Sequence, residues 1–257
     1  MVSNTNQTRF VTAMSLDGYK EYGKRFIDSF MKYANGYSLI VYGRKSLPEL
    51  PDEIELRYKD SIREFDQLLS EFKRDPILCG TQEHPQKKWK DKEKLFGYSY
   101  RFDASKFCRM VVVMHHAARS LAKMDGVKYM IWLDGDTVVR QDIPKDIVEK
   151  ALNGKDYAYL GRPGKYTETG FLVFDIERCM PILDKWVKYY TEGWYAFEKE
   201  WHSAWLFDRA REAYPDIVGH NLTPNGRGHV IHQCWVGKIF DHLKGNRKRA
   251  GRSREAR

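Results

Sequence analysis

The sequence of 257 residues contains few cysteines and few prolines. Its four cysteines are Cys79, Cys108, Cys179 and Cys234. No two of them form a Cys-x-x-Cys pair, which excludes a zinc ribbon and a dithiol redox motif. The chain has only nine prolines, and it is 42% hydrophobic and 31% charged, which excludes a collagen-like or disordered chain. We therefore expect a folded protein with reduced, mostly buried thiols.

Long apolar runs are also absent. No run approaches the roughly 18 residues that a membrane-spanning helix needs. Residues 1–6 have neither the basic flank nor the apolar stretch of a signal peptide. The sequence therefore predicts a soluble cytoplasmic protein without a membrane span.

Positive charge is concentrated at one end of the chain. The formal net charge is +9, and residues 244–257, with seven cations and one anion, account for +6 of it. We expect residues 1–245 to form one domain, because this length suits a single large core and no repeat or linker interrupts it. Residues 246–257 are expected to form a mobile basic tail that grips the phosphates of a nucleotide or of a nucleic acid.

Hydrophobic periodicity alternates between short strands and longer helices, which predicts an α/β fold with a mixed, mostly parallel sheet flanked by helices. The expected strands are 9–14, 37–43, 54–58, 128–133, 157–161 and 170–174. The expected helices are 18–33, 61–72, 103–122, 180–190 and 194–213. Pro181 suits the first turn of its helix.

The periodicity disappears between residues 74 and 98, where five lysines surround Trp89. This pattern is typical of a solvated surface loop, and the alternative is a lid over a ligand that carries phosphate. Further on, one face of the expected helix 194–213 would hold Trp194, Phe197, Trp201 and Trp205. Such a stripe predicts core packing.

The most informative stretch is an apolar strand that ends in Asp134-Gly135-Asp136. Two neighbouring carboxylates repel each other unless they share a cation. Open α/β sheets bind their ligands at the carboxyl ends of strands. The stretch therefore predicts a site for a divalent metal.

Two chemistries use such a pair. The string 134–138 resembles the first motif of the haloacid-dehalogenase phosphatases, in which Asp134 would be the nucleophile and Asp136 a general acid. That family opens its fold with this motif and needs a later acidic pair. Here 133 residues precede the motif and no such pair follows, so the phosphatase is the second choice.

The pair also resembles the Asp-x-Asp motif of the GT-A glycosyltransferases. Four strings together are similar to small single-domain transferases encoded by phages and bacteria: WLDGDT (132–137), YLGR (159–162), EWH (200–202) and DHLKGNRK (241–248). The resemblance implies a GT-A, Rossmann-like domain. It also implies a hexosyl- or pentosyltransferase that moves a sugar from a nucleoside-diphosphate-sugar to a glycan, a protein or a modified DNA base.

The resemblance also implies roles for individual residues. Asp134 and Asp136 would hold Mn²⁺ or Mg²⁺ with His242 as third ligand, while His229 and His232 remain alternatives. The residues implied to bind the donor are Ser15, Lys106, Arg109, Asp134 and Lys244, with Arg247 or Lys248 in support. An inverting enzyme needs a base, for which Glu168, Glu200 and Glu198 are candidates; a retaining enzyme needs none.

The acceptor is open at this stage. The basic C-terminal residues and the lysines of 87–94 favour DNA or another polyanion as acceptor. A nucleic-acid-binding protein without enzymatic activity is the alternative from another class, but it gives the Asp134 and Asp136 pair no purpose.

Overall fold

The computed structural model describes residues 4–44, 46–58 and 62–253. The chain divides into two compact units. The first, which we call the sheet unit, comprises Met1–Lys59, Ala117–Cys179 and Asp216–Arg257. The second, which we call the helical unit, comprises Asp60–His116 and Met180–Pro215.

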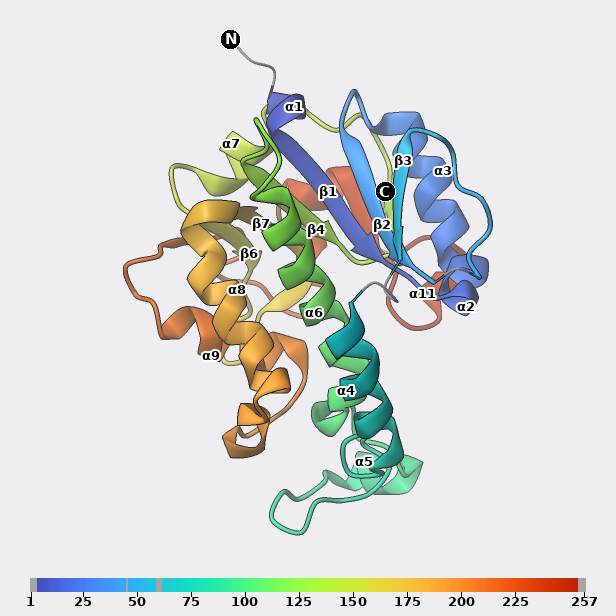
Figure 1. Cartoon of the computed structure of the whole chain (residues 1–257), viewed down its shortest axis with the longest axis vertical. Coiled ribbons are helices and arrows are strands. Elements are labelled where there is room, and N and C mark those ends of the chain that lie inside the picture. The colour runs from blue at the N-terminus through green and yellow to red at the C-terminus, as the bar shows by residue number, and fades with distance from the viewer. Residues whose placement is uncertain (1–3, 45, 59–61, 254–257) are drawn as a thin grey trace. The chain divides into compact units, whose positions relative to one another are not determined.

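A seven-stranded sheet forms the centre of the sheet unit, in the order β3-β2-β1-β4-β7-β6-β8 (Figure 1). Its strands are β1 Thr8–Ala13, β2 Ser38–Gly43, β3 Ile54–Tyr58, β4 Tyr129–Leu133, β6 Tyr157–Leu160, β7 Glu168–Asp175 and β8 Gly219–Asn221. Strand β7 is antiparallel to both of its neighbours, while all other neighbours are parallel. The predicted mixed, mostly parallel α/β fold is confirmed, as are all six predicted strands to within two residues.

Strands β1 and β4 lie in the middle of this sheet and are paired from Thr8 with Tyr129 to Val11 with Trp132. Both are apolar because the core covers them: Phe10 and Ile131 have no exposed surface. Since the two strands are parallel, the residues that follow them, from Met14 and from Asp134, emerge at the same edge. A separate two-stranded ladder joins β5 (Thr137–Val139) to β9 (Phe240–His242).

Helices in the sheet unit are mostly short. They are α1 Asn4–Gln7, α2 Leu16–Gly18, the π-helix η1 Tyr19–Gly23, α3 Lys24–Tyr33, α7 Ile147–Leu152, the 3₁₀-helix η5 Val230–Gln233, α10 Val236–Ile239 and α11 Arg247–Ala250. The helical unit holds α4 Arg63–Arg74, α5 Asp91–Phe96, the 3₁₀-helices η3 Tyr100–Phe102 and η4 Trp194–Phe197, and α9 Ser203–Glu212. Helices α6 Ala104–Leu121 and α8 Ile176–Thr191 contribute residues to both units. None of the helices in the described ranges is long and apolar enough to cross a membrane.

The expected single helix over 194–213 is wrong. The chain forms η4, runs extended from Glu198, and starts α9 only at Ser203, where the His202 ring accepts a hydrogen bond from the Trp205 backbone N–H. The four aromatic residues therefore do not share one helix face: Phe197 is 90% exposed, whereas Trp201 is 1% exposed. Periodicity misled here because a cap and an extended stretch happened to preserve helical spacing.

Two further helix predictions need correction. Helix α8 begins at Ile176, four residues before the expected start, so Pro181 lies inside the helix and not in its first turn. The segment 74–98, expected to be an irregular loop, contains α5, which ends at Gly97 in the left-handed conformation with φ of 60°. The local order comes from the Glu93 carboxylate, which accepts a hydrogen bond of 2.7 Å from the Lys90 backbone N–H at the start of α5, a contact that hydrophobic periodicity does not reveal.

The described part of the basic C-terminal segment makes hydrogen bonds to other parts of the sheet unit, to which it belongs. Arg25 donates a hydrogen bond of 2.8 Å to the Lys248 carbonyl. The buried Ser253 donates its backbone N–H to Asp241 at 2.9 Å. The Lys248 ammonium of α11 lies over the Tyr22 ring of η1, near the other end of the chain, 4.7 Å from its centroid. Residues 254–257 of the predicted tail lie outside the described residues.

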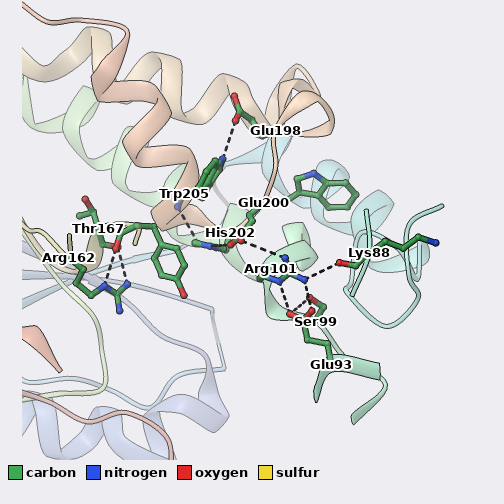
Figure 2. Close-up of polar contacts among 12 residues, drawn as sticks. Lys88, Glu93, Ser99, Arg101, Arg162, Thr167, Glu198, Glu200, His202 and Trp205 are labelled. Atoms are coloured by element: carbon green, nitrogen blue, oxygen red, sulfur yellow. Dashed lines mark hydrogen bonds and ion pairs between the residues drawn. The ribbon is translucent and has the colours of Figure 1, made fainter. Parts of the chain in front are cut away.

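Within the helical unit, a buried ion cluster joins segments that are distant in sequence (Figure 2). Arg101 contacts Glu93 at 2.6 Å and Glu200 at 3.6 Å. Glu200 in turn accepts a hydrogen bond of 2.9 Å from His202, whose other ring nitrogen accepts from the Trp205 N–H. This pattern fixes the neutral His202 with its proton on Nε2. Breaking such a buried pair on one side leaves an uncompensated charge, so the cluster holds these segments together.

This cluster predicts acid sensitivity. Burial alone would raise the pKa of Glu93, but hydrogen bonds from Arg101, the Lys90 N–H and Ser99 lower it to about 2. A carboxyl with a lowered pKa in the folded state stabilises the protein fully above its unfolded pKa of roughly 4.3 and less as the pH falls toward 2. We expect Glu93→Gln to cost about 2 kcal/mol at pH 7 and to flatten the loss of stability between pH 5 and 2. Thermal unfolding at several pH values measures this, and parallel curves for the two proteins would contradict it.

Candidate functional site

The turn after β4 presents the two carboxylates of the Asp-x-Asp string. The Asp134 N–H donates to the Gly170 carbonyl at 3.0 Å, and the Thr137 N–H donates to the Asp134 carbonyl at 3.1 Å, which closes the turn. A Cβ atom on Gly135 would lie 3.3 Å from the Ala13 carbonyl oxygen, so the turn lies close to the end of β1. Backbone contacts thus hold both carboxylates at the carboxyl edge of the parallel strands.

His242 is brought to these carboxylates by the ladder between β5 and β9, in which it pairs with Thr137. Its Nε2 atom lies 3.1 Å from Asp136 Oδ1 and 3.5 Å from Asp134 Oδ2. One ligand atom from each of the three residues lies within 4.8 Å of the others, an arrangement that could hold a metal ion. In the described part of the chain no other group of His, Cys, Asp and Glu meets this criterion.

The other two candidate histidines lie outside this group. His232 Nε2 contacts Asp241 Oδ1 at 3.2 Å. The His229 ring packs edge-on against His232, with centroids 4.7 Å apart, and its Nδ1 contacts Arg247. The sequence left three histidines open, and the geometry favours His242.

The site is electrostatically coupled. The pKa of Asp134 is raised to about 6. Burial is the largest cause and the charge of Asp136 adds to it, while His242 and Trp132 act in the opposite direction. Burial acts the same way on Asp136, but His242 and Lys248 outweigh it and lower its pKa. Against the effect of its own burial, His242 has a raised pKa because both aspartates face it. The site thus concentrates negative charge and holds it with cationic partners.

Two lysines of the C-terminal segment have separate partners. Lys248 Nζ lies 2.9 Å from Asp136 Oδ2 and 4.7 Å from the centroid of the Tyr22 ring. Lys244, the lysine that the sequence favoured for the donor diphosphate, forms an ion pair with Glu168. The structure therefore places Lys248, which the sequence gave only a supporting role, next to the metal candidates.

Glu168 lies at the start of β7 on the other side of His242. Its Oε2 atom pairs with Lys244 and lies 3.6 Å from Arg162, and its Oε1 atom is 3.8 Å from His242 Nδ1. Burial would raise the pKa of Glu168, but Lys244, His242 and Arg162 lower it to about 2. Figure 2 shows the Arg162 guanidinium held by the carbonyl of Thr167, next to Glu168 in sequence.

Ser15, the candidate for nucleoside contact, follows β1 and therefore lies at the same sheet edge as Asp134. Its hydroxyl accepts a hydrogen bond of 3.1 Å from the Gly18 N–H and caps α2. Its role in the free protein is thus to start this helix.

Three other candidates lie in the helical unit. Lys106 and Arg109 are on α6, where Lys106 is exposed and Arg109 is half-buried. The buried Nε of Arg109 has no hydrogen-bond partner among the described residues. Glu200 belongs to the Arg101 cluster; burial would raise its pKa, but the hydrogen bond from His202 and the charge of Arg101 lower it.

The close packing of Gly170 against His242 gives a test of the site. A Cβ atom at residue 170 would lie 2.5 Å from His242 Cε1 and Nδ1, which forces the imidazole to move. We expect Gly170→Ala to weaken Mn²⁺ binding by about tenfold or more, as is typical when a ligand loses its support. Isothermal titration with Mn²⁺ measures the change, and an unchanged affinity in a protein that melts at the wild-type temperature would contradict it.

We compared the chain with family models, curated proteins and solved structures. No family model matches the chain, and no curated protein matches it by sequence. Among solved structures, the chain is similar to the apo form of mouse xyloside xylosyltransferase 1, with a TM-score of 0.48 and 12% identity, covering 84% of each chain. A likeness this weak assigns neither a ligand nor a residue role to this chain.

Proposed function

We propose that this protein is a metal-dependent glycosyltransferase that uses a nucleoside-diphosphate-sugar as donor. The observation that carries the proposal is the group formed by Asp134, Asp136 and His242 at the carboxyl edge of the sheet. In open α/β folds this edge is where ligands bind. Lys248, which contacts Asp136, and Lys244, which contacts Glu168, would supply the charge that a diphosphate requires.

The residues of the group fit a divalent metal. Two carboxylates and one imidazole are a ligand set that suits Mn²⁺ or Mg²⁺, with preference for Mn²⁺ because of the nitrogen ligand. The ammonium of Lys248 already stands against Asp136, which marks the place as one where a cation is favourable. When bound, the metal would neutralise the charge that develops on the leaving nucleoside diphosphate.

Different residues of the chain would bind the metal and the diphosphate. Asp134, Asp136 and His242 would hold the cation, and Lys248, which contacts Asp136, and Lys244, which contacts Glu168, would bind phosphate oxygens. Glu168 lies 3.8 Å from His242 Nδ1, a buried atom with no hydrogen-bond partner among the described residues, and would orient the imidazole once it moved within hydrogen-bond distance. An imidazole oriented by a carboxylate is a common feature of metal sites.

The candidate bases are less well suited to their role. Burial would raise the pKa values of both Glu168 and Glu200, but Lys244 lowers that of Glu168, and the hydrogen bond from His202 lowers that of Glu200. A carboxylate with a lowered pKa is a weak base. A base role for Glu168 therefore requires that Lys244 leaves it when the donor binds. We propose that the acceptor activated by such a base is a glycan, a protein or a modified DNA base.

A thermal-shift screen tests the proposal. The protein is heated with each of a set of nucleoside diphosphates and nucleotide-sugars, with and without Mn²⁺. We expect one nucleotide class to raise the melting temperature, and to do so mainly with Mn²⁺. No shift with any nucleotide would contradict the proposal. Hydrolysis of simple phosphate esters without nucleotide binding would favour a phosphatase, and binding of nucleic acid alone would favour a protein without this activity.

A further inference from the structure

Segment 87–100 of the helical unit exposes large apolar side chains that the proposed function does not use. Leu95 and Phe96, at the end of α5, are 80% and 68% exposed. Tyr98 and Tyr100 follow them and are 36% and 40% exposed. We call segment 87–100 the α5 platform. Single exposed apolar residues are common, but adjacent large ones on one short element point to an interaction surface.

Buried side chains fix the conformation of the platform. Trp89 is 8% exposed and packs in a cluster with Phe102 and Trp201. Glu93, on the inner side of α5, bonds the Lys90 N–H, the Ser99 hydroxyl and Arg101. Figure 2 shows this arrangement, with Arg101 between Glu93 and Glu200. The exposed Leu95 and Phe96 are therefore presented on a fixed element.

The same platform is positively charged at its surface. Four of its lysines are exposed: Lys88, Lys90, Lys92 and Lys94. Among its acidic residues, Asp91 is exposed, whereas Glu93 is buried and committed to Arg101. The exposed surface of the platform thus has a net charge of +3 around its apolar residues. A partner that fits it is anionic and also offers an apolar layer.

We propose that the α5 platform binds the surface of a membrane that contains anionic lipids. Leu95 and Phe96 would enter the boundary between headgroups and acyl chains, and the lysines would contact the headgroups. Tyr100, which is 40% exposed, has the amphipathic ring that favours this boundary. A nucleic acid would satisfy the lysines but leaves Leu95 without a role, since leucine neither stacks on bases nor bonds them. The proposal is independent of the proposed catalytic function.

Sedimentation with vesicles tests it, using the full chain without metal or nucleotide. We expect binding to vesicles of phosphatidylcholine with 30% phosphatidylserine and none to phosphatidylcholine alone. The double variant Leu95→Ser/Phe96→Ser should weaken binding by about tenfold or more, because it removes the apolar part of the contact. Lys92→Glu/Lys94→Glu should weaken it by about 25-fold or more, since each lysine near an anionic surface contributes roughly fivefold. Both pairs are exposed, so the melting temperature should stay close to that of the wild type.

Val218→Ser is the matched control, because Val218 is an exposed apolar residue of the sheet unit, 42% exposed and outside the platform. It should bind vesicles as the wild type does. Three results would overturn the proposal: no binding to anionic vesicles, binding that Leu95→Ser/Phe96→Ser leaves unchanged, or binding lost equally in Val218→Ser. Binding of a DNA duplex that is lost in Lys92→Glu/Lys94→Glu, without vesicle binding, would assign the platform to nucleic acid instead.

Discussion

Asp136→Asn is expected to reduce turnover of the preferred nucleotide-sugar by at least ~10³-fold, because it removes a charged ligand from the metal group and with it the stabilisation of the leaving diphosphate. Asparagine keeps the size of the side chain, so the backbone contacts of the turn, including the bond from the Leu243 N–H to the carbonyl of residue 136, are retained. The substitution therefore separates the charge of residue 136 from its place in the fold.

The measurements are hydrolysis or transfer of the nucleotide-sugar in the presence of Mn²⁺, and Mn²⁺ binding by isothermal titration. Asp142→Asn is the matched control, since Asp142 is an exposed acidic residue a few positions further along the chain. It should retain both activity and metal affinity. Wild-type turnover in Asp136→Asn would disprove the metal role of this residue, whereas loss of both activity and thermal stability would point to misfolding.

The position of Asp134 and Asp136 was predictable from the sequence for a physical reason. An uninterrupted apolar strand must be buried on both faces, and the polar residues that follow it must emerge at an edge of the sheet. Both features are local, so Tyr129–Leu133 and the turn after it are found where they were expected. The parallel pairing of β4 with β1 follows from the alternation of strands and helices.

The rest of the site depends on contacts between distant segments, and periodicity carries no information about them. His242 reaches Asp136 only because the three-residue strand β9 pairs with β5. Lys248 reaches it because Arg25 binds α11 itself through the Lys248 carbonyl and Asp241 binds the chain just after α11 through the Ser253 N–H. From composition alone, the same residues were expected to form a mobile basic tail.

Fastening the C-terminal segment in this way gives Lys248 two roles that oppose each other. In the free protein its ammonium is the cation beside Asp136, while a bound metal would bring a second positive charge to the same carboxylate. Burial would lower the pKa of Lys248, but Asp136 raises it, so the lysine stays charged at neutral pH. Metal binding therefore has to weaken or displace this ion pair, and the lysine that is released lies close to the place proposed for the diphosphate.

Lys248→Met should accordingly change two affinities in opposite directions. Mn²⁺ binding to the free protein should tighten by about tenfold, because a competing positive charge is removed from a partly buried carboxylate. Binding of the nucleoside diphosphate in the presence of Mn²⁺ should weaken by about 10- to 100-fold, the effect of losing a hydrogen bond to a charged group. Methionine keeps the apolar stem against Tyr22, so this packing should survive.

Lys244→Met is the matched control, because Lys244 pairs with Glu168 and has no contact with Asp136 among those the structure describes. It should weaken diphosphate binding without tightening Mn²⁺ binding. Titration of both variants with Mn²⁺, and then with nucleotide at saturating Mn²⁺, separates the two effects. If Lys248→Met leaves Mn²⁺ affinity unchanged or lowers it, Lys248 does not compete with the metal. The contact with Asp136 would then serve only to hold α11 against the sheet unit.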